Sequence, residues 1–382
     1  MRSLSRQLLT LSSSLLVLGA AACAVPTPDD PGSTESAANA APACNPLRVR
    51  SVPLDGVVEG LAPTGDAPLP ALGPDAEGYF HPPTGYTEGG TFASPAEDPG
   101  FAVPEREIAP AAPAGRLRVA EWNVERGNEL AGAIRLMKKI NADVWLLNET
   151  DLYGKNSGGV VVAREIARAL GYSYFTGIEF YERRDDRRGT SGNAIVSRYP
   201  LSDLRSIDIP MFEDQGGHDW SRSSSEPRCG QRNALSATVR VEAADGKPRT
   251  VRLVTLHTEN KTSAKVRQMQ YDHVLSELVV PGEPTILAGD LNTISPGEGS
   301  RFRRELASRV ERDGRARAMF DCSRGDDSHT FSAAMFVRLR IDWMLVQSGD
   351  GEVLDCPPGS YAVRGHDGTS DHRPVVTEMT MK

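Results

Sequence analysis

Carboxylate, amide and imidazole side chains recur in this sequence at the points where apolar runs end. The set comprises Asn123, Glu149, His257, Asp290, Asn292, Asp342, Asp371 and His372. Loops that follow strands are where folded domains gather binding and catalytic groups. We therefore expect these residues, although distant in sequence, to share one site.

Oxygen donors dominate this set. Glu149, Asp290, Asn292 and Asp371 carry them, with the amide of Asn123 in support. Hard oxygen ligands favour Mg²⁺ or Mn²⁺ over Zn²⁺, since the set lacks thiolates and clustered histidines. A divalent ion held in this way could polarise a phosphoryl oxygen and stabilise a leaving alkoxide. Nearby imidazoles could donate hydrogen bonds to the phosphoryl group or move protons.

Each of these side chains also has an ordinary structural interpretation. A carboxylate at a strand end is often a helix cap or loop residue, and Asp290 and Asn292 could simply shape a turn. Asp342 is harder to explain in that way, because it follows Ile341 inside an apolar run, where an unpaired acid is costly. His372 offers the partner that would offset this cost.

The elements that must position these groups alternate between strands and helices from Leu117 onward. The pattern indicates strands at Leu117–Asn123, Asp143–Glu149, Tyr172–Phe180, Asn193–Arg198, Ala234–Val241, Val251–Thr258, Thr285–Asn292, Ile341–Val346 and Pro374–Met379. Apolar spacing predicts helices over Glu129–Ile140, around 162–170 and over Ser263–Leu278. Such alternation is typical of layered α/β proteins.

The order of seven short motifs resembles that of the endonuclease/exonuclease/phosphatase superfamily. From Leu117 to the C-terminus, about 265 residues, the motifs are WNVERG, DVWLLNE, GNAIVSRYPL, TLHTEN, AGDLNT, RIDWMLV and SDHRPV. Each motif alone is weak evidence, but all of them stand in family order at predicted strand ends. The resemblance implies an α/β four-layer sandwich of two packed mixed β-sheets flanked by helices.

The resemblance also implies roles for the residues that would hold metal and water. Glu149 matches the metal-binding glutamate of the family, Asn123 the asparagine beside it, and Asp371 the last aspartate on the metal side. Asp290 matches the aspartate that positions or deprotonates the attacking water. Asn292 matches its partner, which contacts the scissile phosphate.

Further matches concern the phosphoryl group. His372 matches the histidine that binds this group, and Asp342 resembles the carboxylate that pairs with that histidine and orients its ring. His257 resembles an additional histidine of the deoxyribonuclease and sphingomyelinase branches. Asn193 and Arg373 are expected on the substrate side, Asn193 as a hydrogen-bonding support. The implied reaction is single-step attack of water on phosphorus without a covalent intermediate.

Three residues near these motifs depart from the family pattern. Trp122 precedes Asn123 where many relatives carry a smaller side chain, so the site can be shaped differently here. Glu259 and Lys261 follow His257 and could contact substrate, but the sequence assigns them no role.

Residues 1–22 are typical of a secretory signal peptide. Arg2 and Arg6 precede an apolar run that ends in three alanines, and Cys23 follows directly. This arrangement predicts an exported bacterial lipoprotein, periplasmic or on the cell surface, with Cys23 as its lipid-bearing membrane anchor. Cleavage after Ala22 to give a free secreted protein is the alternative.

Residues 23–115 form an acidic extension rich in Pro, Ala and Gly, before a catalytic domain at 116–382. Of the 27 prolines, 17 fall in residues 24–115. This composition is typical of a tether. Aromatic residues between Tyr79 and Phe101 indicate that part of the extension could instead lie against the domain.

The cysteines are consistent with export. After Cys23 there remain Cys44, Cys229, Cys322 and Cys356, an even number that favours two disulfides with three possible pairings. Cys322 with Cys356 is the preferred pair, because the two bracket one predicted strand. Free buried thiols are the alternative.

The predicted catalytic domain carries no net charge. Residues 116–382 contain 38 acidic and 38 basic residues, which excludes a strongly basic nucleic-acid-binding chain. Arginine-rich stretches at 183–188 and 301–317 could contact phosphates, but their interleaved acids favour a salt-bridged surface.

These observations favour an exported, monomeric, divalent-metal-dependent phosphodiesterase, with nuclease action slightly preferred. The same superfamily offers alternatives in lipid head-group phosphodiesterases of the sphingomyelinase kind and in inositol-phosphate phosphatases. An inactive surface-binding module on the same scaffold is the third possibility, and the complete set of site residues argues against it.

Overall fold

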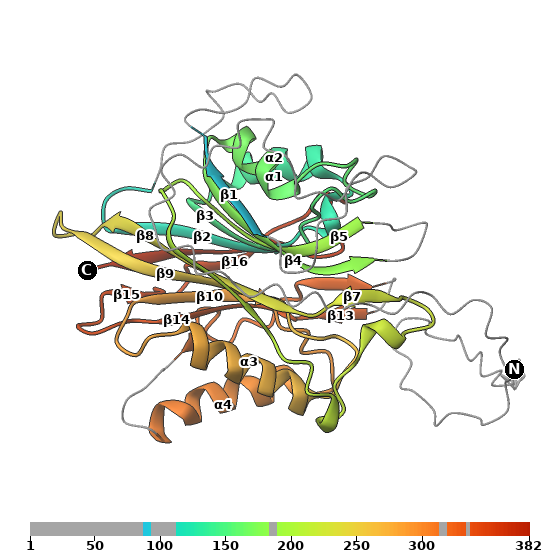
Figure 1. Ribbon diagram of the computed structural model, residues 1–382. Helices are drawn as coiled ribbons and strands as arrows, with labels where there is room; N and C mark the ends of the chain where they lie inside the picture. Colours follow the sequence, from blue (N-terminus) through green and yellow to red (C-terminus); the bar gives the residue numbers. More distant parts are fainter. Residues whose placement is uncertain (1–86, 93–111, 183–188, 313–318, 334–336) are drawn as a thin grey trace, which may run out of the picture. The chain divides into compact units, whose positions relative to one another are not determined.

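The computed structural model describes residues 87–92, 112–182, 189–312, 319–333 and 337–382 (Figure 1). The predicted signal peptide, Cys23, Cys44 and most of the extension lie outside these residues, as does the arginine-rich stretch 183–188. All described residues belong to the unit Cys44–Lys382. Among them, no helix combines the length and apolar character needed to cross a membrane.

The first sheet has nine strands and runs in the order β1-β4-β5-β3-β2-β17-β15, with β7 paired to β4 and β16 paired to β17. Its strands are β1 (Thr87–Thr91), β2 (Arg116–Asn123), β3 (Val144–Asn148), β4 (Ser173–Glu182), β5 (Gly189–Ser197), β7 (Arg228–Gly230), β15 (Leu354–Asp355), β16 (Tyr361–Val363) and β17 (Val375–Met381). β2 and β3 are parallel, whereas β17 is antiparallel to β2, so the sheet is mixed.

The second sheet has six strands in the order β11-β14-β10-β9-β8-β6. They are β6 (Ser202–Asp208), β8 (Asn233–Glu242), β9 (Pro248–Leu256), β10 (Thr285–Asp290), β11 (Phe320–Asp321) and β14 (Asp342–Gln347). β9 and β10 are parallel and their other neighbours antiparallel. A separate hairpin joins β12 (Phe331–Ala333) to β13 (Val337–Leu339).

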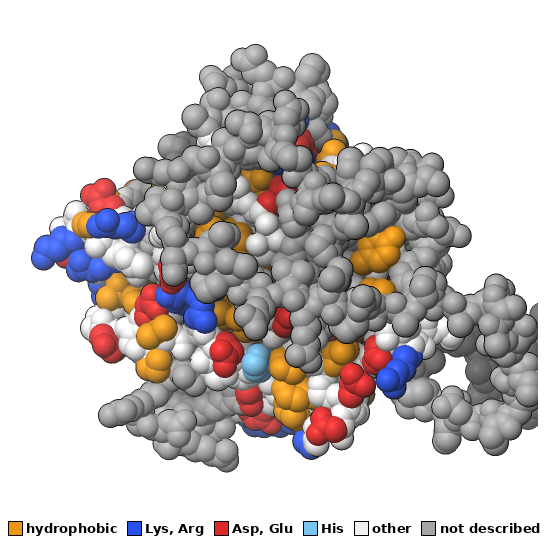
Figure 2. All heavy atoms as spheres, viewed as in Figure 1, with side chains coloured by type: hydrophobic (Ala, Val, Ile, Leu, Met, Phe, Trp, Pro, Cys, Tyr) orange, Lys and Arg blue, Asp and Glu red, His pale blue; other side chains and the backbone are white. Residues whose placement is uncertain are grey.

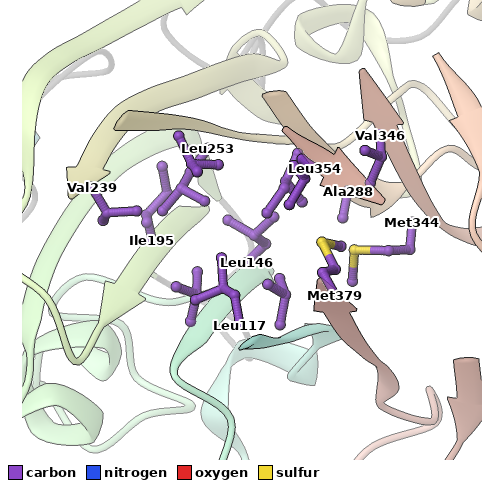
Figure 3. Close-up of a cluster of buried hydrophobic side chains, with 14 of the residues drawn as sticks. Leu117, Leu146, Ile195, Val239, Leu253, Ala288, Met344, Val346, Leu354 and Met379 are labelled. Carbon is purple, nitrogen blue, oxygen red and sulfur yellow. The ribbon is translucent and has the colours of Figure 1, made fainter. Parts of the chain in front are cut away.

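The two sheets pack face to face through apolar side chains. Alternate residues of each strand point to opposite faces, so Leu146 of β3 and Ile195 of β5 meet Leu253 of β9 and Met344 of β14 in one buried cluster (Figure 3). Because the intervening residues of these strands are also apolar, each sheet can bury its other face as well.

Helices cover those outer faces. α1 (Leu130–Ile140) and α2 (Val162–Leu170) pack on the first sheet around Trp145, whereas α3 (Ala264–Leu278) and α4 (Glu298–Arg312) pack on the second around Trp343 (Figure 1). The predicted sandwich of two mixed sheets flanked by helices is confirmed.

Several boundaries differ from the sequence prediction. Glu149 and Asn292 lie beyond β3 and β10, because both have left-handed backbone, with φ of 51° and 44°. A regular strand cannot contain that conformation. Each strand therefore ends earlier than its apolar pattern indicates.

Residues 87–91 of the extension form a strand. β1 pairs antiparallel with β4 over five residues, from Thr87 opposite Gly177 to Thr91 opposite Ser173. Phe92 then stacks on Tyr174 with ring centroids 6.1 Å apart. This part of the extension lies against the domain.

The predicted disulfide between Cys322 and Cys356 is present. Cys229 is also disulfide-bonded, and its partner is not among the described residues. The two cysteines of the chain that remain are Cys23 and Cys44.

Candidate active site

The first sheet brings two site residues together through its parallel pair. Asn123 at the end of β2 stands opposite Asn148 at the end of β3, so that Glu149 leaves the sheet beside Asn123. β17 runs antiparallel to β2, which places its first residue, Val375, near the same edge. His372 precedes β17 by three residues.

The second sheet adds its own residues at the corresponding edge. Asp290 ends β10, and Asp342 opens the antiparallel strand β14 directly opposite it. β9 is parallel to β10, and His257 follows it at the level of Asp290. Asn123 and Asp290, from different sheets, are joined by a hydrogen bond of 3.3 Å from the amide Nδ2 to the carboxylate Oδ2.

One glycine permits β9 and β10 to approach at this edge. A Cβ atom at Gly289 would lie 1.9 Å from the carbonyl oxygen of Leu256 and 3.2 Å from Oδ1 of Asn148. No side chain fits there. The glycine of the AGDLNT motif therefore serves the packing that positions Asp290.

His372 and Asp342 form a buried ion pair. The Nδ1 atom of His372 lies 2.9 Å from each carboxylate oxygen of Asp342. Burial by itself would lower the pKa of His372, but Asp342 and Asp290 raise this pKa to about 10. The ring is therefore an imidazolium at neutral pH. The contact expected between these two residues is present, and it fixes the ring with its Nε2 atom toward Asp290.

Asp290 lies between two histidines. Its Oδ2 atom is 3.6 Å from Nε2 of His372 and 3.5 Å from Nε2 of His257. Its Oδ1 atom accepts the backbone N–H of Asn292 at 2.9 Å. Burial and the nearby carboxylate of Asp342 raise the pKa of Asp290 to about 7. A carboxylate with such a pKa is suited to accept a proton near neutral pH.

Glu149 remains ionised although burial acts against its charge. Burial would raise the pKa of Glu149, but Arg126, His372 and a hydrogen bond from Asn123 lower it. Its left-handed backbone is uncommon for a residue with a side chain, and such conformations cluster at functional sites.

The pKa of Asp371 is shifted in the opposite direction to that of Glu149. Its pKa is raised to about 6 by burial and by the carboxylates of Glu149 and Glu125, against the opposing charge of His372. Neighbouring carboxylates that repel one another would be stabilised by a divalent cation, and carboxylate and amide oxygens are the donors that Mg²⁺ and Mn²⁺ prefer. The residues present therefore fit such an ion.

A different trio satisfies metal-ligand spacing more closely. Asp290, Asp342 and His372 offer ligand atoms within 4.8 Å of one another, whereas Glu149 and Asp371 form no such group with a third acidic or histidine side chain in the described part of the chain. His372 and Asp342, however, are hydrogen-bonded to each other through Nδ1. We therefore interpret this group as an ion pair of His372 with Asp342 that faces Asp290.

Asn193 is fully buried beneath the site. Its Oδ1 atom accepts from Asn148 at 2.7 Å, and its Nδ2 atom donates to Glu179 and to Asn233, each at 2.8 Å. Since its amide is engaged within the protein, Asn193 supports the site from below and does not face a substrate.

Asn292 uses its amide in the same way. Its Nδ2 atom donates to the carbonyl oxygen of Thr258 at 2.9 Å, which ties the loop after β10 to the loop after β9. Contact of Asn292 with a scissile phosphate stays a prediction.

Arg373 lies at the rim beside His372. Its backbone N–H donates to the carbonyl oxygen of Thr330 at 2.7 Å, and its buried Nε atom has no hydrogen-bond partner in the described ranges. Burial and the charges of Arg373 and exposed Arg338 lower the pKa of His329, so both cations act on this part of the surface. Elsewhere, on the face drawn in Figure 2, acidic and basic side chains are interspersed.

Glu259 and Lys261 contact the segment between β6 and β8. Buried Trp220 donates from Nε1 to Glu259, and Nζ of Lys261 lies 4.5 Å from the centre of the Trp220 ring. Lys261 also pairs with Glu226 at 3.0 Å. These contacts give the two residues a structural role.

Two charged residues of the site carry no motif and were missed from the sequence. Glu121 of β2 is fully buried against the carboxyl group of Asp342, and its oxygens accept from no N–H or O–H among the described residues. Arg232 is buried against His257, with 2.8 Å between its Nη1 atom and Nδ1 of the histidine. The acidic residue between Ala120 and Trp122 in the segment RLRVAEWN could have indicated a role for Glu121. Nothing in the sequence around Arg232 indicated a role for that residue.

A model of the Endonuclease/Exonuclease/phosphatase family matches residues 120–372, a span that holds every predicted site residue except Arg373. No curated protein matches the chain significantly. The chain is also similar to solved structures, and each match covers 70% of this chain.

Three of these structures illustrate the similarity. An endonuclease/exonuclease/phosphatase from Beutenbergia cavernae is 19% identical, with 72% of that chain covered and a TM-score of 0.48. D. rerio TDP2 complexed with a single-strand DNA product is 18% identical, with 99% of that chain covered and a TM-score of 0.47. The human Nocturnin catalytic domain with bound sulfate is 15% identical, with 94% of that chain covered and a TM-score of 0.48.

The family match covers more than half of the chain and coincides with the strand ends that carry the motifs. The chain belongs to the endonuclease/exonuclease/phosphatase family.

Proposed function

We propose that this chain is a divalent-metal-dependent phosphodiesterase that hydrolyses its substrate by direct attack of water. Members of its family are hydrolases that act on phosphoester bonds. The observation that supports the proposal best is the position of Asp290, a buried carboxylate flanked at 3.5 and 3.6 Å by the Nε2 atoms of His257 and His372.

The residues around Asp290 provide for a single displacement. A water molecule transfers a proton to Asp290 while its oxygen attacks phosphorus, and the bond from phosphorus to the leaving oxygen breaks in the same step. The imidazolium of His372 donates its Nε2–H to the phosphoryl group as negative charge develops there. Asp342 keeps that ring charged and correctly oriented.

Glu149, Asp371 and Asn123 would hold Mg²⁺ or Mn²⁺, which polarises the phosphoryl group and stabilises the leaving alkoxide. Asn123 also connects this side of the site to Asp290 through its amide nitrogen. Asn148 of β3 joins the same two halves, since its Oδ1 atom accepts the backbone N–H of Asp290 at 2.8 Å and its Nδ2 atom donates to the carbonyl oxygen of Leu256 at 3.1 Å.

Nucleic acid is the substrate class that we favour. Arg373 and exposed Arg338 add positive charge to the rim beside His372, and half-buried Phe331 lies against that histidine with ring centroids 4.8 Å apart. Cations that contact neighbouring phosphates and an aromatic ring that stacks on a base are the elements of single-strand binding.

A lipid head group is the second candidate. Val337 of β13 is 43% exposed, next to Arg338, so the same rim offers an apolar side chain beside a cation. Such a pair can also bind a phospholipid surface.

The test is to incubate the mature chain with supercoiled plasmid and Mg²⁺ or Mn²⁺. We expect nicking that EDTA abolishes and that Asp290→Ala reduces about 10²–10⁴-fold, while Asp245→Ala, an exposed change in the turn between β8 and β9, leaves nicking unchanged. Intact plasmid in every lane would contradict nuclease action and direct the assay to sphingomyelin and inositol phosphates. Unfolded Asp290→Ala would show that Asp290 has a structural role.

We further propose that the protein is exported and anchored through lipidated Cys23. The N-terminal pattern supports this, and the Cys322–Cys356 disulfide is of the kind that persists in oxidising compartments. Labelling of cells with radioactive palmitate should mark the wild-type protein and not Cys23→Ser. Equal labelling of both would refute the anchor.

A further inference from the structure

His257 has a different partner at each ring nitrogen. Nδ1 lies 2.8 Å from Nη1 of Arg232, and Nε2 lies 3.5 Å from Oδ2 of Asp290. The ring is 2% exposed and Arg232 is 3% exposed, so water does not compete for the contact between them.

The chemistry of the guanidinium group decides where the proton of His257 resides. A guanidinium carries five N–H donors and no acceptor, and it keeps its charge in proteins. At 2.8 Å its nitrogen can only donate, so Nδ1 of His257 must present a lone pair. The ring is then neutral, and its single proton is on Nε2, on the side of Asp290.

Arg232 itself is held in place from several directions. Glu179 of β4 accepts from its Nη1 atom at 3.2 Å, and Glu259 lies 3.7 Å from its Nε atom. The ring of Phe180 lies 5.1 Å from its guanidinium carbon. A buried arginine with these partners is rigid and is covered from the substrate side by His257.

We propose that Arg232 is a positioning residue that fixes His257 as the neutral tautomer with its proton on Nε2. This proposal deepens the proposed function and rests on it. His257 then donates a hydrogen bond toward Asp290 and the phosphoryl group and cannot take the proton of the attacking water from that side. Of the ionisable side chains that meet here, Asp290, His257 and His372, only Asp290 remains to accept this proton.

The two histidines of the site thus reach the same orientation by opposite means. Asp342 accepts from Nδ1 of His372 and makes that ring a cation, whereas Arg232 donates to Nδ1 of His257 and keeps that ring neutral. Both leave an N–H at Nε2 facing Asp290.

The first test is the tautomer in the wild-type protein. Long-range ¹H–¹⁵N correlation spectra of the mature, ¹⁵N-histidine-labelled chain, assigned with His257→Gln, should show His257 with a protonated Nε2 and an unprotonated Nδ1 at neutral pH. A proton on Nδ1 would overturn the proposal, and this measurement requires neither a substrate nor an Arg232 variant.

The second test compares variants. Arg232→Met should give a mixture of both His257 tautomers and lower kcat on the plasmid or on bis(p-nitrophenyl) phosphate about 10-fold or more, with a smaller effect on KM. Arg232→Lys, which can still donate to Nδ1, should restore the wild-type tautomer and part of kcat.

Arg198→Met is the matched control for this comparison. Arg198 also pairs with a carboxylate, Asp143 at 3.0 Å, and lies 5.0 Å from the ring centre of Tyr172, but it follows β5 at the edge away from the site. It should change neither the His257 spectrum nor the rates. A wild-type spectrum in Arg232→Met would refute the proposal, whereas a wild-type enzyme inactive on every phosphoester would refute the proposed function alone.

Discussion

At the scale of single residues, the site contains more carboxyl groups than its cations and hydrogen-bond donors can stabilise in the ionised form. Glu121 is the extreme case, because its carboxyl group is fully buried, accepts from no N–H or O–H of the described residues and lies against the carboxyl group of Asp342. Burial, together with the carboxylates of Asp342 and Asp290, raises the pKa of Glu121 well above its ordinary value of 4.5. Folding therefore keeps this side chain protonated at pH values where the unfolded chain would ionise it.

Glu121→Gln should consequently stabilise the protein more as the pH rises. A carboxyl group whose pKa is raised by folding contributes stability below its unfolded pKa and loses that contribution as the pH rises toward the folded pKa, at about 1.4 kcal/mol per pH unit. The amide has no such loss. Urea unfolding at pH 5 and pH 8 should show the advantage of Glu121→Gln growing with pH. The exposed change Glu352→Gln is the control. A difference in the free energy of unfolding between Glu121→Gln and the wild type that does not change with pH would contradict the prediction.

Glu149 allows a test of the metal side that is separate from stability. Glu149→Gln keeps the shape of the side chain and removes its charge, so the Mg²⁺ concentration for half-maximal activity should rise about 10-fold or more. Titration of activity with Mg²⁺ measures this, with exposed Asp245→Asn as the reference. An unchanged Mg²⁺ requirement would remove Glu149 from the ligand set.

At the scale of elements, the close approach of β9 to β10 restricts which residue can occupy position 289. Gly289→Ala would place its Cβ atom 1.9 Å from the carbonyl oxygen of Leu256, so one of the two strands must move. We expect a loss of about 2–4 kcal/mol in the free energy of unfolding, with loss of activity. Gly365→Ala, where a Cβ atom meets only Asp367 at 3.9 Å, should be close to neutral in urea unfolding. Equal free energies of unfolding for Gly289→Ala and the wild type would show that the two strands can move apart at little cost.

The elements that the sequence predicted well are those whose own residues determine them. β3, β10 and β14 are mostly apolar and buried, whereas β2 and β9 mix apolar with polar residues. β2, β3, β9 and β10 end at or next to polar residues of the site, and β14 begins with one. Because parallel neighbours end at one edge, the convergence of Asn123, Glu149, His257 and Asp290 followed from the order of the motifs.

The rest depended on partners distant in the chain. β1, β7 and β13 have five residues or fewer, and such strands form because a neighbouring strand pairs with them. Arg232 is adjacent to His257 only through the pairing of β8 with β9, and Asn193 is buried only because three other side chains surround it. Neither relation is visible in local spacing.

At the scale of the whole molecule, a second disulfide is expected to join the catalytic domain to the N-terminal extension. With Cys322 bonded to Cys356 and Cys229 also bonded, the expectation of two disulfides leaves Cys44 as the partner of Cys229. Peptide mapping without reductant should recover both linked pairs. A free Cys44 would contradict this assignment.

The Cys322–Cys356 bond should also matter for stability. It closes a loop of 34 residues in which β14 lies, and its removal by Cys322→Ala with Cys356→Ala should cost about 2–4 kcal/mol in urea unfolding. With dithiothreitol present, wild type and the double variant should unfold at the same urea midpoint, because neither then retains a disulfide. An unchanged midpoint for the double variant would show that the bond does not contribute.

The disulfide assigned to Cys229 has a mechanical consequence if the protein is held at its N-terminus, as we propose. Tension from Cys23 would pass through Cys44 directly to Cys229 in β7, whose neighbour in the sheet is β4. The pairing of β1 with β4 would then carry no load. Reduction of the bond would remove this covalent path and leave β1 as the first paired strand of the described residues to resist the pull, and its antiparallel pairing would open one residue pair at a time from Thr87 toward Thr91. The redox state of one cysteine would thus decide which strand of the sheet bears tension.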